Sequence, residues 1–142
     1  MVGRKVVRVE DLDVWRRAHQ LVLKIYEGTK DFPQEERFTL VSQMRRSAIS
    51  IPANVAEGFR RNGLRDKVNF YNIAQSSLDE LRYYVVLSRD LGYISDISEI
   101  VHMIDEVGAM LGGLVKSTKA RSRGKNPEAR SQGTGRRGVS EE

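Results

Sequence analysis

Polar side chains able to bind a partner recur along one face of the segment QMRRSAISIPANVAEG, which covers residues 43–58. A guanidinium, a hydroxyl, an amide and a carboxylate recur there at helical spacing. Groups of these kinds can form hydrogen bonds with one another or with a ligand. Two interpretations stay open: a solvated helix face, or a hydrogen-bonded seam buried against another helix or subunit. We call these residues the polar stripe: Arg46, Ser50, Asn54, Glu57 and Arg61.

Basic residues gather in two places, and both predict attraction to the phosphates of a nucleic acid. Residues 1–115 hold 16 basic and 16 acidic residues, whereas residues 116–142 hold 8 and 3, so the net charge of +5 arises in the C-terminal part. That part has no aromatic residue, which argues against base stacking there. The first cluster contains Arg60, Arg61, Arg65 and Lys67, preceded by Arg45 and Arg46. The second contains Lys116, Lys119, Arg121, Arg123, Lys125, Arg130, Arg136 and Arg137.

Several kinds of catalytic and metal chemistry are excluded or not supported. Cysteine is absent, which excludes disulfides, thiolate zinc sites and cysteine nucleophiles. His19 and His102 stand apart, without HxxxH or HExxH spacing, so no metal site is expected. The patterns of phosphate loops, dinucleotide-binding turns and hydrolase elbows do not occur. We therefore expect no catalytic residue, no cofactor and no enzyme activity.

Helical periodicity dominates the chain and predicts an all-α fold. Short connections favour antiparallel neighbours, so we expect an up-down-up-down four-helix bundle. The helices are expected at residues 12–30, 34–62, 65–91 and from residue 95 or 96 to about 120. Residues 1–10 would form an N-terminal extension and residues 11–120 the bundle. Residues 121–142, rich in glycine and charge, predict a disordered basic tail.

The second expected helix runs through Pro52. Its apolar residues recur at spacings of three and four on both sides of the proline, so the helix is expected to kink there without ending. Glu35 and Glu36 would occupy its first turn, and Gly63 would end it. The apolar positions are Val41, Met44, Ala48, Ile51 and Val55.

The third and fourth helices carry features that predict further packing. Residues 83–87 of the third helix are all apolar or aromatic and point around most of its circumference, which predicts a second buried contact and a homo-oligomer. Gly92 would end this helix. Gly108, Gly112 and Gly113 weaken the fourth helix, so we expect them to allow close helix approach.

Three segments resemble one bacterial family of four-helix bundles, the 23S ribosomal RNA intervening-sequence proteins. They are DLDVWRRAHQLVLKIYEGTKDFP, QMRRSAISIPANVAEG and NFYNIAQSSLDELRYYVVLSRDLGYI, and the resemblance covers about residues 11–115. It implies a non-enzymatic, ring-shaped homopentamer. The family also includes the accessory variability protein of diversity-generating retroelements, which binds a reverse transcriptase and its template RNA. The signature residues are Arg45, Arg46, Ser50, Ile51, Pro52, Asn54, Glu57, Gly58, Ser77, Leu78, Glu80 and Leu81.

The leading hypothesis is a non-enzymatic oligomeric adaptor that binds structured RNA through basic turns and tails. The first alternative is an accessory subunit that binds a reverse transcriptase, and the second is a structural oligomer without a nucleic-acid role. No segment has the length and apolarity of a membrane span, and the N-terminus lacks a signal-peptide core. We therefore expect a cytoplasmic protein that does not bind a membrane.

Overall fold

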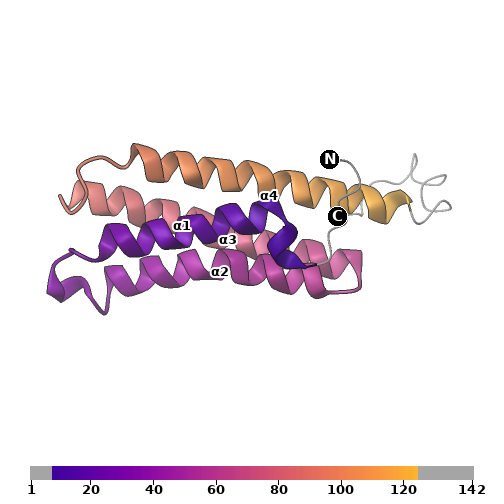
Figure 1. The fold of residues 1–142 in the computed structure, drawn as a ribbon, viewed down its shortest axis with the longest axis horizontal. Coiled ribbons are helices and arrows are strands. Elements are labelled where there is room, and N and C mark those ends of the chain that lie inside the picture. Colours follow the sequence, from indigo (N-terminus) through magenta and orange to yellow (C-terminus); the bar gives the residue numbers. More distant parts are fainter. Residues whose placement is uncertain (1–7, 125–142) are drawn as a thin grey trace.

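The computed structural model describes residues 8–124, and all of its regular structure there is helical (Figure 1). Residues 1–7 and the predicted basic tail from residue 125 on, with Lys125, Arg130, Arg136 and Arg137, lie outside the described residues. The elements are the 3-10 turns η1 (Val9–Asp11) and η2 (Gln34–Glu36) and the helices α1 (Asp13–Thr29), α2 (Leu40–Arg60), α3 (Leu64–Asp90) and α4 (Ser98–Gly124).

The four long helices form the predicted bundle around one core. Helix α1 packs against α2 and α4, and α3 packs against α2 and α4, so each helix has two neighbours. They run side by side along the long axis of the molecule (Figure 1). Each helix contributes fully buried side chains to the core, for example Leu21, Met44, Leu81 and Leu111. Burial of these apolar surfaces is the main force that holds the helices together.

Helix α2 passes through Pro52, as predicted, and the apolar residues on both sides of the proline are buried. Its predicted start at residue 34 is wrong. Thr39 has φ −119° and ψ −95°, which is not helical, so α2 begins at Leu40 after the separate turn η2. Glu36 stabilises this arrangement because its carboxylate accepts hydrogen bonds from the hydroxyls of Thr39 (2.7 Å) and Tyr93 (2.8 Å).

The two predicted glycine caps have different outcomes. Gly92 has φ +84°, and the N–H groups of Gly92 and Tyr93 bond the carbonyls of Arg89 and Ser88, so it ends α3 as predicted. Gly63 does not end α2. It is extended, with φ −79° and ψ 136°, and immediately precedes α3. The terminal carbonyls of α2 are covered in another way, described below.

The wide apolar surface of α3 is used inside the bundle. Because α3 lies between α2 and α4, Val85 is fully buried and Tyr84, Val86 and Leu87 are partly buried against the core, leaving Tyr83 60% exposed. The predicted second contact is therefore supplied by the same chain. The surface of α3 by itself does not require a partner subunit.

The glycines of α4 do not all serve helix packing. A Cβ on Gly108 would lie 3.3 Å from Cδ2 of Leu78, which fits close approach of α3. Gly112 and Gly113 are exposed, with nothing within 4 Å of such an atom, so the expectation is wrong for them within this chain. Helix α4 also continues to Gly124, beyond the predicted boundary at residue 120.

Candidate nucleic-acid interface

The connection from α2 to α3 is shaped by the absence of a side chain at Gly58. A Cβ there would lie 2.6 Å from Cε1 of Tyr71 and 3.1 Å from the carbonyl oxygen of Lys67. Real Cβ atoms do not approach neighbours so closely, so only glycine allows the end of α2 to pack this tightly on α3. Gly58, a signature residue, therefore positions the basic connection that follows it.

Lys67 covers the end of α2. Its ammonium group donates to the carbonyl oxygens of Gly58 (3.2 Å), which also accepts from the N–H of Arg61, and of Phe59 (2.7 Å), in the last turn of the helix. This bond explains why no left-handed glycine is needed at the end of α2. Partial burial, followed by the nearby positive charge of Arg121, lowers the pKa of Lys67.

The packing of α3 against α4 places the two basic clusters at one end of the bundle. Arg121 lies on the last turns of α4, far from Lys67 in sequence, yet its charge acts on Lys67 and on Tyr71. In Figure 1 the α2–α3 connection and the C-terminal end of α4 lie at the same end of the bundle. We call this region the basic end and define it by Arg60, Arg61, Arg65, Lys67 and Arg121.

Two acidic residues neutralise part of the basic end. The carboxylate of Glu57 bonds Arg60 at 2.7 Å and Arg61 at 2.8 Å, and these contacts, chiefly that with Arg60, lower the pKa of Glu57. Arg61 also lies 3.8 Å from Asp66. Arg65 is exposed and makes no ion pair with another described residue, and the same holds for Arg121. These last two cations are the most available for an external phosphate.

Two aromatic rings lie beneath cations at the basic end. The guanidinium of Arg61 lies 4.7 Å from the centre of the Phe70 ring, and the ammonium of Lys67 lies 5.7 Å from that of Phe59. Both rings are partly exposed. Helical spacing did not reveal these pairings, although Phe70 lies only three residues after Lys67 and Phe59 two residues before Arg61 in the chain.

The remaining basic candidates lie in several places. Lys116 is exposed and Lys119 partly exposed on α4, within about two turns of Arg121. Arg123 lies in the last turn of α4, and Lys125 lies outside the described residues. Arg46 is exposed on α2, where it makes no ion pair with another described residue.

Arg45 does not belong to the basic end. It precedes Arg60 by 15 residues of continuous helix, which corresponds to about 22 Å. Its guanidinium lies 4.4 Å from the ring centre of Tyr26, and its Nε donates to the hydroxyl of Thr29 at 3.0 Å. The sequence grouped Arg45 with the first basic cluster, but in the structure Arg45 lies apart from that cluster.

The polar stripe of α2 combines the two interpretations that the sequence left open. Arg46 is exposed, whereas the hydroxyl of Ser50 lies 2.7 Å from that of Ser77 on α3. The amide of Asn54 donates to the carbonyl (2.8 Å) and hydroxyl (2.9 Å) of Ser50. The stripe is thus a partly buried seam between α2 and α3.

Another signature residue, Glu80, has a local role on α3. Its exposed carboxylate accepts a hydrogen bond of 2.7 Å from the hydroxyl of Tyr84, one turn further along α3. This bond raises the pKa of Tyr84. Both residues belong to the same helix, so the contact supports the helix surface.

Neither a metal centre nor a membrane span is found in the part of the chain that the structure describes. Glu99 and His102 have the i, i+3 spacing of some helical metal sites, but Glu99 bonds Lys24 at 2.8 Å. No three described His, Asp or Glu side chains gather in a way that would hold a metal ion. Within residues 8–124, no helix is both long and apolar enough to cross a bilayer.

Comparisons with known proteins agree with this architecture. Residues 10–113 match the sequence model of the family described as 23S rRNA-intervening sequence protein. A crystal structure from Bacteroides thetaiotaomicron, of a protein with unknown function from the S23 ribosomal protein family, is similar with a TM-score of 0.67 and 25% sequence identity. That similarity covers 72% of this chain and 95% of that one. No curated protein matches the chain.

Proposed function

The chain belongs to the 23S rRNA-intervening sequence protein family, and on that premise we propose that it is a non-enzymatic adaptor that binds structured RNA through its basic end. The observation that carries the proposal is that the α2–α3 connection and the C-terminal end of α4 lie at the same end of the bundle (Figure 1), which unites two basic segments distant in sequence. Several cations on a single surface attract a phosphate backbone much more strongly than the same cations do when they lie on separate surfaces.

The side chains of the basic end have the chemistry for two kinds of RNA contact. Arg65 and Arg121 are cations without an ion pair among the described residues, so they are suited to phosphate oxygens. Phe59 and Phe70 are partly exposed rings beside cations, a combination that stacks on unpaired bases. This combination favours an RNA whose loops or ends present unstacked bases beside a folded backbone.

An oligomer would present several basic ends to the same RNA, and we propose that it forms through α1 and α2. Arg45 contacts Tyr26, which fixes the register of these antiparallel helices. Ile49 lies one turn after Arg45 on α2, and Leu23 lies one turn before Tyr26 on α1. Because the two helices are antiparallel, Ile49 and Leu23 lie at the same level of the bundle. Leu23 is 53% exposed and Ile49 43% exposed, and burial between copies would remove this apolar surface from water.

Filter binding with structured RNA tests the proposal. Arg65→Gln combined with Arg121→Gln should weaken binding by about tenfold or more, because each charged hydrogen bond contributes about 1.5–3 kcal/mol. Arg89→Gln is the control, since Arg89 is exposed at the other end of α3 and bonds Asp90. A shortened chain that ends at Gly124 keeps the basic end intact, so its binding isolates the contribution of residues 125–142.

The outcome separates this proposal from its alternatives. Equal RNA affinity of the double variant and the Arg89→Gln control would refute the basic end as the binding surface. A protein without measurable affinity for RNA would instead favour the structural oligomer. Specific co-purification of a reverse transcriptase, with RNA binding only in its presence, would favour the accessory-subunit alternative.

A further inference from the structure

A second polar site lies at the opposite end of the bundle, where the chain passes from α1 to α2. It is a hollow of about 380 Å³. Figure 1 shows this connection at the far end of α2 from the basic end, so the two sites are separate. The residues that line the hollow are Thr29, Lys30, Phe32, Pro33, Gln34, Arg37, Val41 and Arg45.

Arg45 is held in a fixed position at the wall of this hollow. Its Nε donates to the hydroxyl of Thr29 at 3.0 Å, and its Nη2 donates to the carbonyl of Tyr26 at 3.4 Å. Thr29 is 2% exposed and itself donates to the carbonyl of Ile25 at 2.7 Å, so the acceptor is fixed as well. The Nη1 group of Arg45 makes no hydrogen bond to a described residue and is free for a ligand.

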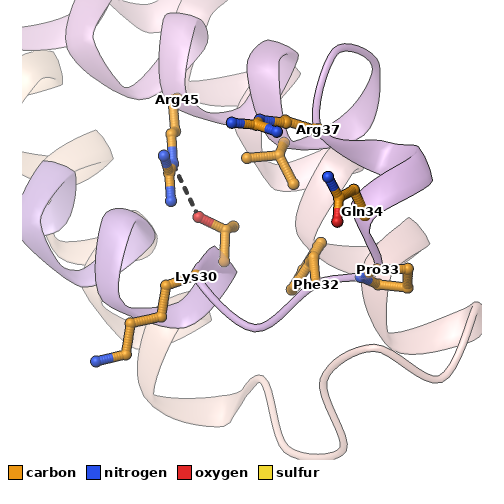
Figure 2. Close-up of a pocket in the computed structure, with 8 residues that line it drawn as sticks. Lys30, Phe32, Pro33, Gln34, Arg37 and Arg45 are labelled. Carbon is orange, nitrogen blue, oxygen red and sulfur yellow. Dashed lines mark hydrogen bonds between the residues drawn. The ribbon is translucent and has the colours of Figure 1, made fainter.

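Arg37 provides a second guanidinium. In Figure 2 its side chain extends toward Arg45 across the hollow, with the amide of Gln34 nearby, while the ammonium of Lys30 points away. Arg37 makes no ion pair with another described residue; its contact is with the neighbouring Phe38 ring, 5.4 Å from the ring centre. Two cations therefore face each other without an acidic partner between them.

No carboxylate lines the hollow, and no described acid forms an ion pair with Arg37 or Arg45. The carboxylate of Glu36 accepts hydrogen bonds from Thr39 and Tyr93, and that of Glu27 lies 3.6 Å from the ammonium of Lys30. Like charges repel, and an anion bound between them converts that repulsion into attraction.

We propose that the hollow binds the phosphate group of a small phosphorylated molecule. The guanidinium fork of Arg37, the Nη1 group of Arg45 and the amide of Gln34 supply more donors than a carboxylate with two oxygens can use, and they match a phosphate monoester with three terminal oxygens. The hollow is larger than a phosphate group, and Phe32, Pro33 and Val41 form an apolar wall for the organic part of the ligand. This site does not depend on RNA binding at the basic end.

Equilibrium dialysis of the intact chain with radiolabelled inorganic phosphate and with AMP, at constant ionic strength, tests this site. Both probes are expected to bind, whereas adenosine is not, because it lacks the phosphate. Arg37→Gln should raise the dissociation constant by about tenfold or more, since it removes a charged donor from an exposed position. Arg16→Gln is the matched control and should leave the constant unchanged, because Arg16 is exposed near the start of α1, at the opposite end of this helix from the hollow, and pairs with Asp13.

Two results would overturn the proposal. One is the absence of binding of both probes by the natural sequence. The other is an equal loss of binding in Arg37→Gln and Arg16→Gln, which would indicate a nonspecific attraction to the positive surface. Equal affinity for phosphate and AMP would identify free phosphate as sufficient, whereas tighter binding of AMP would identify the ester as the preferred ligand.

Discussion

Substitution of Gly58 by alanine should destabilise the fold, although alanine is the better helix former. An ideal Cβ would lie 2.6 Å and 2.9 Å from two ring carbons of Tyr71 and 3.1 Å from the carbonyl oxygen of Lys67. Favourable contacts between carbon atoms lie at about 3.5–4.0 Å, so the overlap with the ring approaches 1 Å. Tyr71 is 2% exposed, so its ring cannot move aside into solvent without displacing its neighbours.

The expected magnitude follows from two opposing effects. Overpacking of a core position costs about 1–3 kcal/mol. Replacing a helical glycine by alanine returns at most about 1 kcal/mol. The close approach to both the ring and the carbonyl places the cost in the upper part of that range, about 2–3 kcal/mol, so the free energy of unfolding should fall by about 1–2 kcal/mol.

Urea unfolding followed by circular dichroism at 222 nm measures this change, with the protomer concentration held constant because an oligomer shifts the apparent stability. Gly112→Ala is the matched control: a Cβ there meets nothing within 4 Å, so this variant should be more stable by about 0.5–1 kcal/mol. In a Tyr71→Leu background the cost of Gly58→Ala should shrink. An equal or greater stability of Gly58→Ala relative to the natural sequence would refute the packing argument.

Three further variants test other contacts. Lys67→Met should lower the free energy of unfolding by about 1–2 kcal/mol in the same urea assay, because it removes the charged donor from the carbonyls of Phe59 and Gly58 and leaves Gly58 only the N–H of Arg61; an unchanged midpoint would contradict this role. The pKa of Glu57 is lowered in the folded state, so its ion pairs stabilise the protein above about pH 4.5 and this contribution disappears as the pH falls through the folded pKa. Glu57→Gln should therefore lose less stability than the natural sequence between pH 5 and 3, and parallel pH curves would exclude the pairing. Leu23→Glu should reduce the molar mass measured by light scattering, whereas Tyr83→Glu, outside the proposed interface, should not.

The sequence predicted those features that depend on local periodicity. The apolar positions of α2, from Val41 to Val55, are buried on both sides of Pro52 because their helical spacing directs them to one face. Gly92 was recognised as a helix end because only glycine readily adopts its positive φ. The family resemblance was confirmed by the match over residues 10–113.

The features that the sequence did not predict depend on contacts between distant segments. The start of α2 is set by Thr39 and by Glu36, whose partner Tyr93 follows α3. The pattern of residues 83–87 predicts a partner subunit, because it does not reveal that α3 has a neighbour on each side. Nothing in the spacing of Arg45 indicated its bond to Thr29.

The candidate site also combines features that the sequence predicted with features that depend on contacts between distant segments. The two basic clusters were visible in the sequence, but their union at one end required the antiparallel packing of α3 and α4, which brings Arg121 near Lys67. The pairing of Phe70 with Arg61 also spans the turn between α2 and α3. Charge composition identified the basic residues, and the topology of the bundle decided which of them act together.

The salt dependence of RNA binding tests the central claim most directly. If the basic end binds phosphates, the logarithm of the binding constant falls linearly with the logarithm of salt concentration, with a slope of about 0.7–0.9 for each phosphate contact. The variant carrying Arg65→Gln and Arg121→Gln should show a shallower slope than Arg89→Gln and the natural sequence. An identical slope in all three proteins would contradict the claim that RNA binds at this end of the bundle.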